Sequence, residues 1–128
     1  MSQENVDVVR ALFAALDSQD WEAALGLFDP DVEWAPTEGR FHGVDGVVTS
    51  LAEWLEPWDE HYIEPEEFAE AGAEVLAVIH LTGRSERGSE MAIDQRFFQL
   101  YAVRDGKITR MLEFTRRDEA LEAAGLSE

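Results

Sequence analysis

The side chains best suited to chemistry lie near the end of the chain, in the stretches 95–103 and 107–115. Glu113 is the first candidate, because a carboxyl group among aromatic rings loses solvation, which raises its pKa and suits it to general acid or base catalysis. Gln99, or Tyr101 through its hydroxyl, could donate a hydrogen bond to a carbonyl oxygen whose charge grows when a neighbouring carbon is deprotonated. These residues predict enolisation chemistry without a metal. The alternative is a structural pairing of Glu113 with Arg96, Arg110 or His80.

Whether these side chains share a face depends on the turn between the two stretches, Arg104-Asp105-Gly106. The turn suits a three-residue loop, in which a type I turn is followed by Gly106 in the left-handed conformation as a bulge residue. Gln99 then lies opposite Met111 and diagonal to Glu113, with about 7 to 8 Å between the two backbones. One face of this hairpin carries polar and aromatic groups together: Phe97, Gln99, Tyr101, Met111 and Glu113. Such a mixture is typical of a pocket wall.

His80 is the second candidate for a catalytic base, because imidazole titrates near neutral pH. It lies in the apolar stretch 75–81, so a hydrogen-bonded place in the core or in an interface is the alternative. We expect His80 to line the same space as Trp34, Tyr101 and Met111. Trp54 and Trp58 are candidates for the mouth of the pocket, although the helical spacing of Trp54 also fits the core.

Composition restricts the partners of the chain. Ten Lys and Arg against 28 Asp and Glu give a net charge of −18, which repels phosphate backbones and anionic lipid surfaces. The acidity could steer cationic ligands or serve solubility alone. The start lacks a basic signal region, and no apolar run has the length of a membrane span. We therefore expect a cytoplasmic protein without nucleic-acid or membrane partners.

No metal or cofactor is predicted. The three histidines, His42, His61 and His80, lack the close spacing of zinc ligands, and there is no Cys. A glycine-rich phosphate loop and a serine elbow are also missing from the sequence.

Hydrophobic periodicity predicts helices first and long strands afterwards. Helices are expected at 4–17, 21–28, 45–57 and 119–124, and strands at 32–35, 62–71, 74–83, 95–103 and 107–115. Asp20 should cap the second helix and Asp29-Pro30-Asp31 should end it. Asp118 should cap the last helix and Gly125 should end it. Residues 86–89 should join the strands 74–83 and 95–103. This order describes an α+β domain.

Four segments of the chain carry a resemblance to a known family. They are Asn5 to Trp34, which includes Asp20-Trp21-Glu22-Ala23-Ala24; Phe41-His42-Gly43; Arg104-Asp105-Gly106-Lys107-Ile108; and the tail from Arg117 to Leu126. The chain resembles the SnoaL-like group of the nuclear transport factor two-like superfamily, which includes ketosteroid isomerases and polyketide cyclases. The resemblance implies a single domain over residues 1–128. Its fold would be a cystatin-like α+β cone, in which N-terminal helices pack into a curved, mostly antiparallel sheet around an internal cavity.

The resemblance also bears on the site. Leu12 falls where ketosteroid isomerases have a tyrosine donor, and Gln99 falls where they have a protonated aspartate. Their base aspartate falls at Ala35 or Pro36, so the catalytic set of those enzymes is not retained. The residues expected to bind substrate are Leu12, Trp34, Phe97, Gln99, Tyr101 and Met111.

The opposite face of the hairpin is also apolar. Because family members are often dimers through the convex sheet face, the resemblance implies a homodimer through Phe98, Leu100, Leu112 and Phe114. The alternative is that a helix of the same chain covers this face.

Three hypotheses follow for the function. The first is a metal-free isomerase, cyclase or lyase that acts by acid-base chemistry on a hydrophobic carbonyl compound, such as a polyketide-like or steroid-like molecule. Glu113 would be the acid or base, with His80 as its substitute or partner. The second is a non-catalytic protein that binds a small hydrophobic ligand, and the third is a dimeric scaffold whose cavity is incidental.

Overall fold

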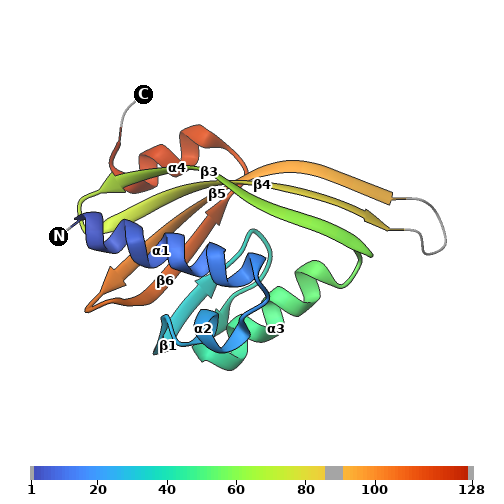
Figure 1. Cartoon of the computed structure of the whole chain (residues 1–128). Coiled ribbons are helices and arrows are strands. Elements are labelled where there is room, and N and C mark those ends of the chain that lie inside the picture. Colours follow the sequence, from blue (N-terminus) through green and yellow to red (C-terminus); the bar gives the residue numbers. More distant parts are fainter. Residues whose placement is uncertain (1, 86–90, 127–128) are drawn as a thin grey trace.

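The structure is a computed structural model, and it describes residues 2–85 and 91–126 (Figure 1). The helices are α1 (Ser2–Asp17), α2 (Trp21–Leu25), α3 (Gly43–Leu55) and α4 (Arg117–Ala124). The strands are β1 (Phe28–Ala35), β2 (Phe41–His42), β3 (Glu60–Ala71), β4 (Glu74–Ser85), β5 (Met91–Arg104) and β6 (Lys107–Phe114). The predicted connection at 86–89 lies outside the described residues.

All the strands form one sheet in the order β2-β1-β6-β5-β4-β3. The β1–β6 pair is parallel and the other pairs are antiparallel. Figure 1 shows α1 and α3 on one side of this curved sheet and α4 on the other. The predicted α+β architecture, with N-terminal helices packed against a mostly antiparallel sheet, is confirmed.

The inner face of the sheet carries the main core, because side chains alternate between the two faces of a strand. On β4 the residues Val75, Ala77, Ile79 and Leu81 point inward and are at most 1% exposed. Val9 and Leu12 of α1 and Val47 of α3 are equally buried against this face. This core fixes α3, which forms one side of the pocket described below.

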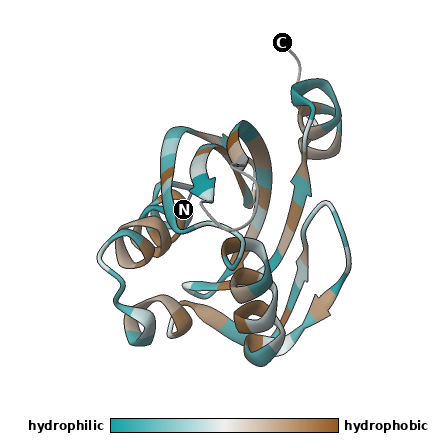
Figure 2. Cartoon of the chain, turned by 90° about the vertical axis from the view of Figure 1, so that its right-hand side faces the viewer, coloured by the Kyte–Doolittle hydropathy of each residue, from teal (hydrophilic) through white to brown (hydrophobic). Residues whose placement is uncertain are grey.

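The outer face is partly covered by α4, which stands apart from the other helices (Figure 2). A second cluster of buried side chains joins Ala120 of α4 to the sheet residues Leu76, Val78, Phe98 and Leu100. The alternative that a helix of the same chain covers Phe98 and Leu100 is therefore confirmed. Leu112 and Phe114 pack against the same cluster but are only half-buried. A homodimer through this face stays a prediction.

The segment after α2 differs from the prediction. Asp20 caps α2 as expected, since its carboxylate accepts a hydrogen bond from the Ala23 N–H at 3.1 Å. The helix then ends at Leu25, and β1 already begins at Phe28 and includes Pro30. A proline is tolerated there because the pairing of β1 with β6 is interrupted between Phe28 and Glu33.

Two further details of the elements were not predicted. The short strand β2 pairs with Glu33 and Trp34 of β1, inside a segment expected to be a loop. The last helix begins at Arg117, two residues earlier than predicted, so that Asp118 lies inside α4 and not at its cap. Gly125 closes the helix with a φ of 74°.

The turn between β5 and β6 is tighter than predicted. Arg104 pairs with Lys107, so the loop contains only Asp105 and Gly106, with φ values of 53° and 77°. Positive φ at both positions is the signature of a type I′ turn, which suits a two-residue hairpin loop. The expected three-residue loop is therefore wrong.

A bulge corrects the register of this hairpin. Val103 pairs with Ile108 but Ala102 pairs with Arg110, which leaves Thr109 as an extra residue. The Thr109 hydroxyl donates a hydrogen bond to the Ala102 carbonyl at 3.2 Å. Because the bulge shifts the register by one, Gln99 pairs directly with Glu113. The predicted grouping of Gln99 and Glu113 on one face is thus confirmed, although the turn that produces it is different.

No helix within the described ranges is long and apolar enough to cross a membrane.

Candidate functional site

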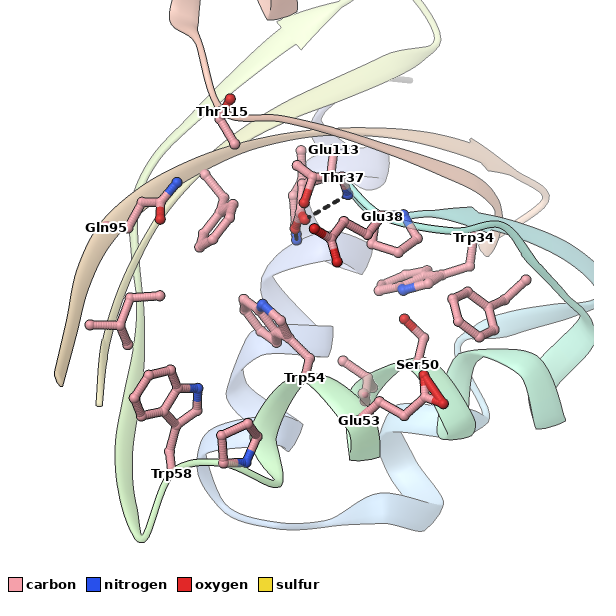
Figure 3. A pocket seen from close by; sticks show the side chains of 17 residues that line it. Trp34, Thr37, Glu38, Ser50, Glu53, Trp54, Trp58, Gln95, Glu113 and Thr115 are labelled. Atoms are coloured by element: carbon pink, nitrogen blue, oxygen red, sulfur yellow. Dashed lines mark hydrogen bonds between the residues drawn. The ribbon is translucent and has the colours of Figure 1, made fainter. Parts of the chain in front are cut away.

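A pocket of about 410 Å³ lies between the inner face of the sheet and α3 (Figure 3). Its volume is within the range usual for small-molecule sites. Aromatic rings from five segments form much of the wall: Trp34, Phe41, Trp54, Trp58 and Phe97. The indole of Trp54 on α3 meets the ring of Phe97 on β5 edge-on, with 5.6 Å between the ring centres. The polar part of the wall includes Gln95, Gln99, Glu113 and Ser50.

A chain of hydrogen bonds runs from the core to the pocket wall. The Tyr101 hydroxyl donates to Oε1 of Gln99, and Nε2 of Gln99 donates to Oε2 of Glu113 at 2.6 Å. The other carboxylate oxygen of Glu113 accepts a hydrogen bond from the Thr37 N–H at 3.2 Å, drawn as a dashed line in Figure 3. Both oxygens of Glu113 are thus held in place.

The end of β1 places Thr37 against Glu113. Ala35 is the last residue of β1 that pairs with β6, where it lies beside Leu112. Beyond that point the chain leaves the sheet at Pro36, which has no N–H to contribute to a ladder. The Thr37 N–H can then reach the side chain of Glu113.

The environment sets the protonation of the two acidic groups. Burial raises the pKa of the Glu113 carboxyl, and the hydrogen bonds from Gln99 and Thr37 offset part of that rise. Burial raises the pKa of Tyr101 well above its usual value, and the nearby Glu113 carboxylate adds to the rise. Tyr101 is therefore a neutral donor that fixes the orientation of the Gln99 amide, so that its nitrogen faces Glu113.

Four of the predicted site residues line the pocket: Trp34, Phe97, Gln99 and Glu113. Tyr101 lies behind Gln99, is 1% exposed and acts on the pocket only through that amide. Leu12 and Met111 were expected in the wall, but both are fully buried in the core below it. Leu12 faces the sheet from α1, and Met111 lies on β6 beside Tyr101, where the helices cover it.

The prediction that His80 shares this space is wrong. On β4 the alternating residues Ile79 and Leu81 point to the inner core, so His80 points to the outer face. There its Nε2 atom lies 2.5 Å from Oδ1 of Asp94. The predicted structural partners of Glu113 are also engaged elsewhere, since Arg96 pairs with Glu66 and Arg110 with Glu74.

The outer face also holds a group of potential metal ligands. Carboxylate and imidazole atoms of Glu64, Glu66 and His80 lie within 4.8 Å of one another. However, the Arg96 guanidinium donates two hydrogen bonds to Glu66, at 2.6 and 3.1 Å. A positive charge already occupies the position beside Glu66, and this arrangement does not favour a cation site.

Several residues of the pocket were not predicted. Glu38 comes from the loop after β1, and Ser50 and Glu53 come from α3. Trp58, expected at the mouth, lies over Gly83 of β4, where an added Cβ atom would come within 3.1 Å of the indole. The glycine inside this strand was the signal in the sequence, because glycine within a strand often marks a close approach.

Comparison with known proteins gives the family of the chain. The family model described as a SnoaL-like domain matches residues 9–111. An uncharacterized protein of Mycobacterium tuberculosis is 34% identical over 117 residues, which are 86% of this chain and 87% of that protein. A counterpart from Mycobacterium bovis matches to the same extent.

Solved structures share the fold. The crystal structure of TerC, co-crystallised with polyporic acid, is 27% identical with a TM-score of 0.74, over 95% of this chain and 98% of TerC. A Jannaschia protein described as a SnoaL-like polyketide cyclase is 20% identical with a TM-score of 0.78, over 100% of this chain and 96% of that protein. With a family model that matches most of its length, the chain belongs to the SnoaL-like domain family.

Proposed function

We propose that the pocket binds a small hydrophobic carbonyl compound and that Glu113 acts on it as a general base and acid. The observation that carries this proposal is a half-buried carboxyl group that has only neutral hydrogen-bond donors and lies in an aromatic pocket. Its raised pKa brings the neutral and ionised forms closer in energy, which suits a group that must accept and return a proton. TerC, a protein of the same fold, was crystallised with an organic ligand.

The proposed reaction is a proton transfer along the substrate. The Glu113 carboxylate takes a proton from a carbon next to the carbonyl group, and the electron pair of the broken C–H bond moves to the carbonyl oxygen. The protonated Glu113 then returns the proton to a conjugated carbon, which gives an isomer, or to the same carbon, which regenerates the substrate. Burial favours the neutral form of Glu113 that exists between these two steps.

Gln99 is the proposed donor to the developing oxyanion. One hydrogen of its amide nitrogen is directed to Glu113, and an amide nitrogen has two. The second hydrogen can be offered to the substrate oxygen. Tyr101 is a positioning residue in this scheme, because its hydroxyl proton is given to Gln99.

A non-catalytic binding protein is the second candidate. It is favoured by the fact that both oxygens of Glu113 already accept hydrogen bonds, which lowers the reactivity of the carboxylate. It is also favoured by Leu12, which lies in the core where ketosteroid isomerases would have their tyrosine donor.

The test uses 2-tetralone, an aromatic ketone with acidic C–H bonds, as the probe. NMR follows the exchange of its α-protons for deuterium in the presence of the protein. We expect wild type to accelerate exchange and Glu113→Gln to lose about 100-fold or more of this acceleration, because general-base catalysis is typically worth that much. Binding of 2-tetralone, followed by tryptophan fluorescence, should persist in the variant.

The matched control is Glu66→Gln, which makes the same substitution on the outer face of the sheet. It should exchange 2-tetralone at the wild-type rate. Equal rates for Glu113→Gln and wild type would exclude Glu113 as the base. Binding without any accelerated exchange in wild type would favour the non-catalytic candidate.

A further inference from the structure

We propose that the ligand of this pocket carries a positive charge, as a protonated amine or a quaternary ammonium group attached to an apolar body. This inference rests on the proposed function, in that the pocket must first bind a small molecule. It goes further because it assigns the sign of the charge that the pocket selects.

The aromatic wall provides the first argument. Three indole rings, those of Trp34, Trp54 and Trp58, line one pocket together with the rings of Phe41 and Phe97. The face of an aromatic ring carries negative partial charge and attracts cations, and tryptophan does so most strongly. Several rings around one space are the usual means of recognising an ammonium group.

The charged groups of the wall provide the second argument. Three carboxyl groups line the pocket from three different segments: Glu38 after β1, Glu53 on α3 and Glu113 on β6. Among the described residues that line it, none is Lys, Arg or His. Figure 3 shows Glu38 and Glu53 on opposite walls. An anionic ligand would therefore meet only like charges, whereas a cationic one would find an opposite charge on more than one side.

The carboxylates of Glu38 and Glu53 are free to meet a ligand. Both side chains are exposed at the rim. Within residues 2–85 and 91–126, neither takes part in an ion pair. By contrast, several carboxylates elsewhere on the surface are paired with arginines, as Glu66, Glu67 and Glu74 are.

The charge of the whole chain acts in the same direction. A net charge of −18 produces a negative potential that raises the local concentration of cations and repels anions. A cleft with apolar walls concentrates such a field. Of the two roles that the sequence allows for the net negative charge, solubility and the steering of cationic ligands, this pocket favours the second.

A bound cation would also complete the proposed mechanism. Burial favours the neutral form of Glu113, but a positive charge nearby favours the ionised one. A cationic substrate would therefore bring with it the charge that keeps Glu113 ready to accept a proton.

The preference for a cation applies to this pocket and not to a neighbouring hollow that contains Arg40. A second hollow shares Thr37 and Glu113 with the pocket, but its wall adds Arg40, Leu112 and Phe114. An anion attracted to the protein would be expected there, beside the guanidinium, and the Arg40→Gln variant can detect it.

The experiment compares three probes with one phenyl ring each: the cation phenyltrimethylammonium, its neutral isostere tert-butylbenzene and the anion benzoate. Their dissociation constants are measured with the full chain by tryptophan fluorescence and ligand-observed NMR. We expect phenyltrimethylammonium to bind about tenfold tighter than tert-butylbenzene, and benzoate to bind least. Added salt should weaken only the binding of the cation.

Variants locate the source of the preference. The double variant Glu38→Gln/Glu53→Gln should reduce the affinity for the cation several-fold and leave tert-butylbenzene unchanged. The control Glu70→Gln/Glu122→Gln changes the net charge equally, at two exposed glutamates that do not line the pocket. It should leave both affinities near wild type.

Each other outcome overturns the inference. If tert-butylbenzene binds as tightly as the cation, the pocket binds small molecules but does not select charge, and the proposed function is unaffected. If benzoate binds best and still does so in Arg40→Gln, the pocket prefers an anion and the inference fails, while the proposed function is unaffected. If the control variant weakens the cation as much as the double variant does, the pocket carboxylates are not responsible. If no charge probe binds but 2-tetralone does, this inference fails alone. If 2-tetralone does not bind either, the proposed function fails with it.

Discussion

The pocket and the outer face of the sheet both place a carboxylate beside hydrogen-bond donors from other segments of the chain, yet the two sites have opposite electrostatics. In the pocket, Glu113 has only neutral donors, Gln99 and the Thr37 N–H, and burial raises its pKa. On the outer face, Glu66 has the charged Arg96, whose hydrogen bonds lower the pKa of that carboxyl. The charge of the partner and the access of water, and not the residue types alone, separate a reactive carboxyl from a solvated ion pair.

Replacing Gln99, the neutral hydrogen-bond partner of Glu113, is expected to have the largest effect on stability. Gln99→Leu would leave the buried Tyr101 hydroxyl without its acceptor and remove one of the two donors of Glu113. An unsatisfied buried group costs about 1–3 kcal/mol, so the free energy of unfolding in urea should fall by about that amount. The counterpart on the outer face is Arg96→Leu, which removes an exposed ion pair and should change stability little. Equal losses in the two variants would mean that the Gln99 network does not stabilise the pocket.

The two faces of β4 should respond differently to small changes. Gly83→Ala would place a Cβ atom within 3.1 Å of the Trp58 indole and 3.2 Å of the Ile93 side chain. Overpacking of this kind typically costs about 1–3 kcal/mol, and the displaced indole should also weaken binding of 2-tetralone. The neighbouring Thr82→Ala, on the outer face of the same strand, serves as the control. Unaltered stability and binding in Gly83→Ala would show that the indole can shift without consequence.

The dependence of stability on pH should have opposite signs at the two sites. The pKa of Glu113 is raised on folding, so its contribution to stability is present below the ordinary value of 4.5 and is lost as pH rises through the higher folded value. The pKa of Glu66 is lowered, so its contribution is present above 4.5 and is lost as pH falls through the lower folded value.

Urea unfolding over a series of pH values, with Glu113→Gln and Glu66→Gln, measures these contributions. Relative to wild type, Glu113→Gln should gain stability as the pH rises above 4.5. Glu66→Gln should be less stable than wild type above that pH and should approach it in acid. Parallel pH profiles for the two variants would remove the distinction between the sites.

Much of the fold was predictable because it rests on local signals. Period-two stretches gave the long strands, and the Asp20 cap and Gly125 marked the ends of helices correctly. The shared face of Gln99 and Glu113 was also predicted, but from a three-residue loop that does not occur. A two-residue turn with a bulge at Thr109 gives the same alternation, so side-chain pattern alone could not distinguish the two.

The parts of the site that were missed depend on contacts between distant segments. Glu38 and Glu53 reach the pocket only because the loop after β1 and α3 fold over the same end of the sheet. His80 was misplaced because every residue of the stretch 75–81 except His80 is apolar. The pattern of this stretch therefore does not distinguish the inner face of the strand from the outer one. The partner strand decides it, since Arg96 and Glu64 lie beside His80 in the sheet.

Desolvation, and not ion pairing, sets the direction in which the pKa of the Glu113 carboxyl is shifted. The most direct test is an NMR titration of the side-chain carboxyl carbons of wild type, with Glu113→Gln and Glu66→Gln used to assign the two signals. We expect Glu113 to titrate above the ordinary carboxyl pKa of 4.5 and Glu66 to titrate below it. A Glu113 that titrates at or below the pKa of Glu66 would contradict it.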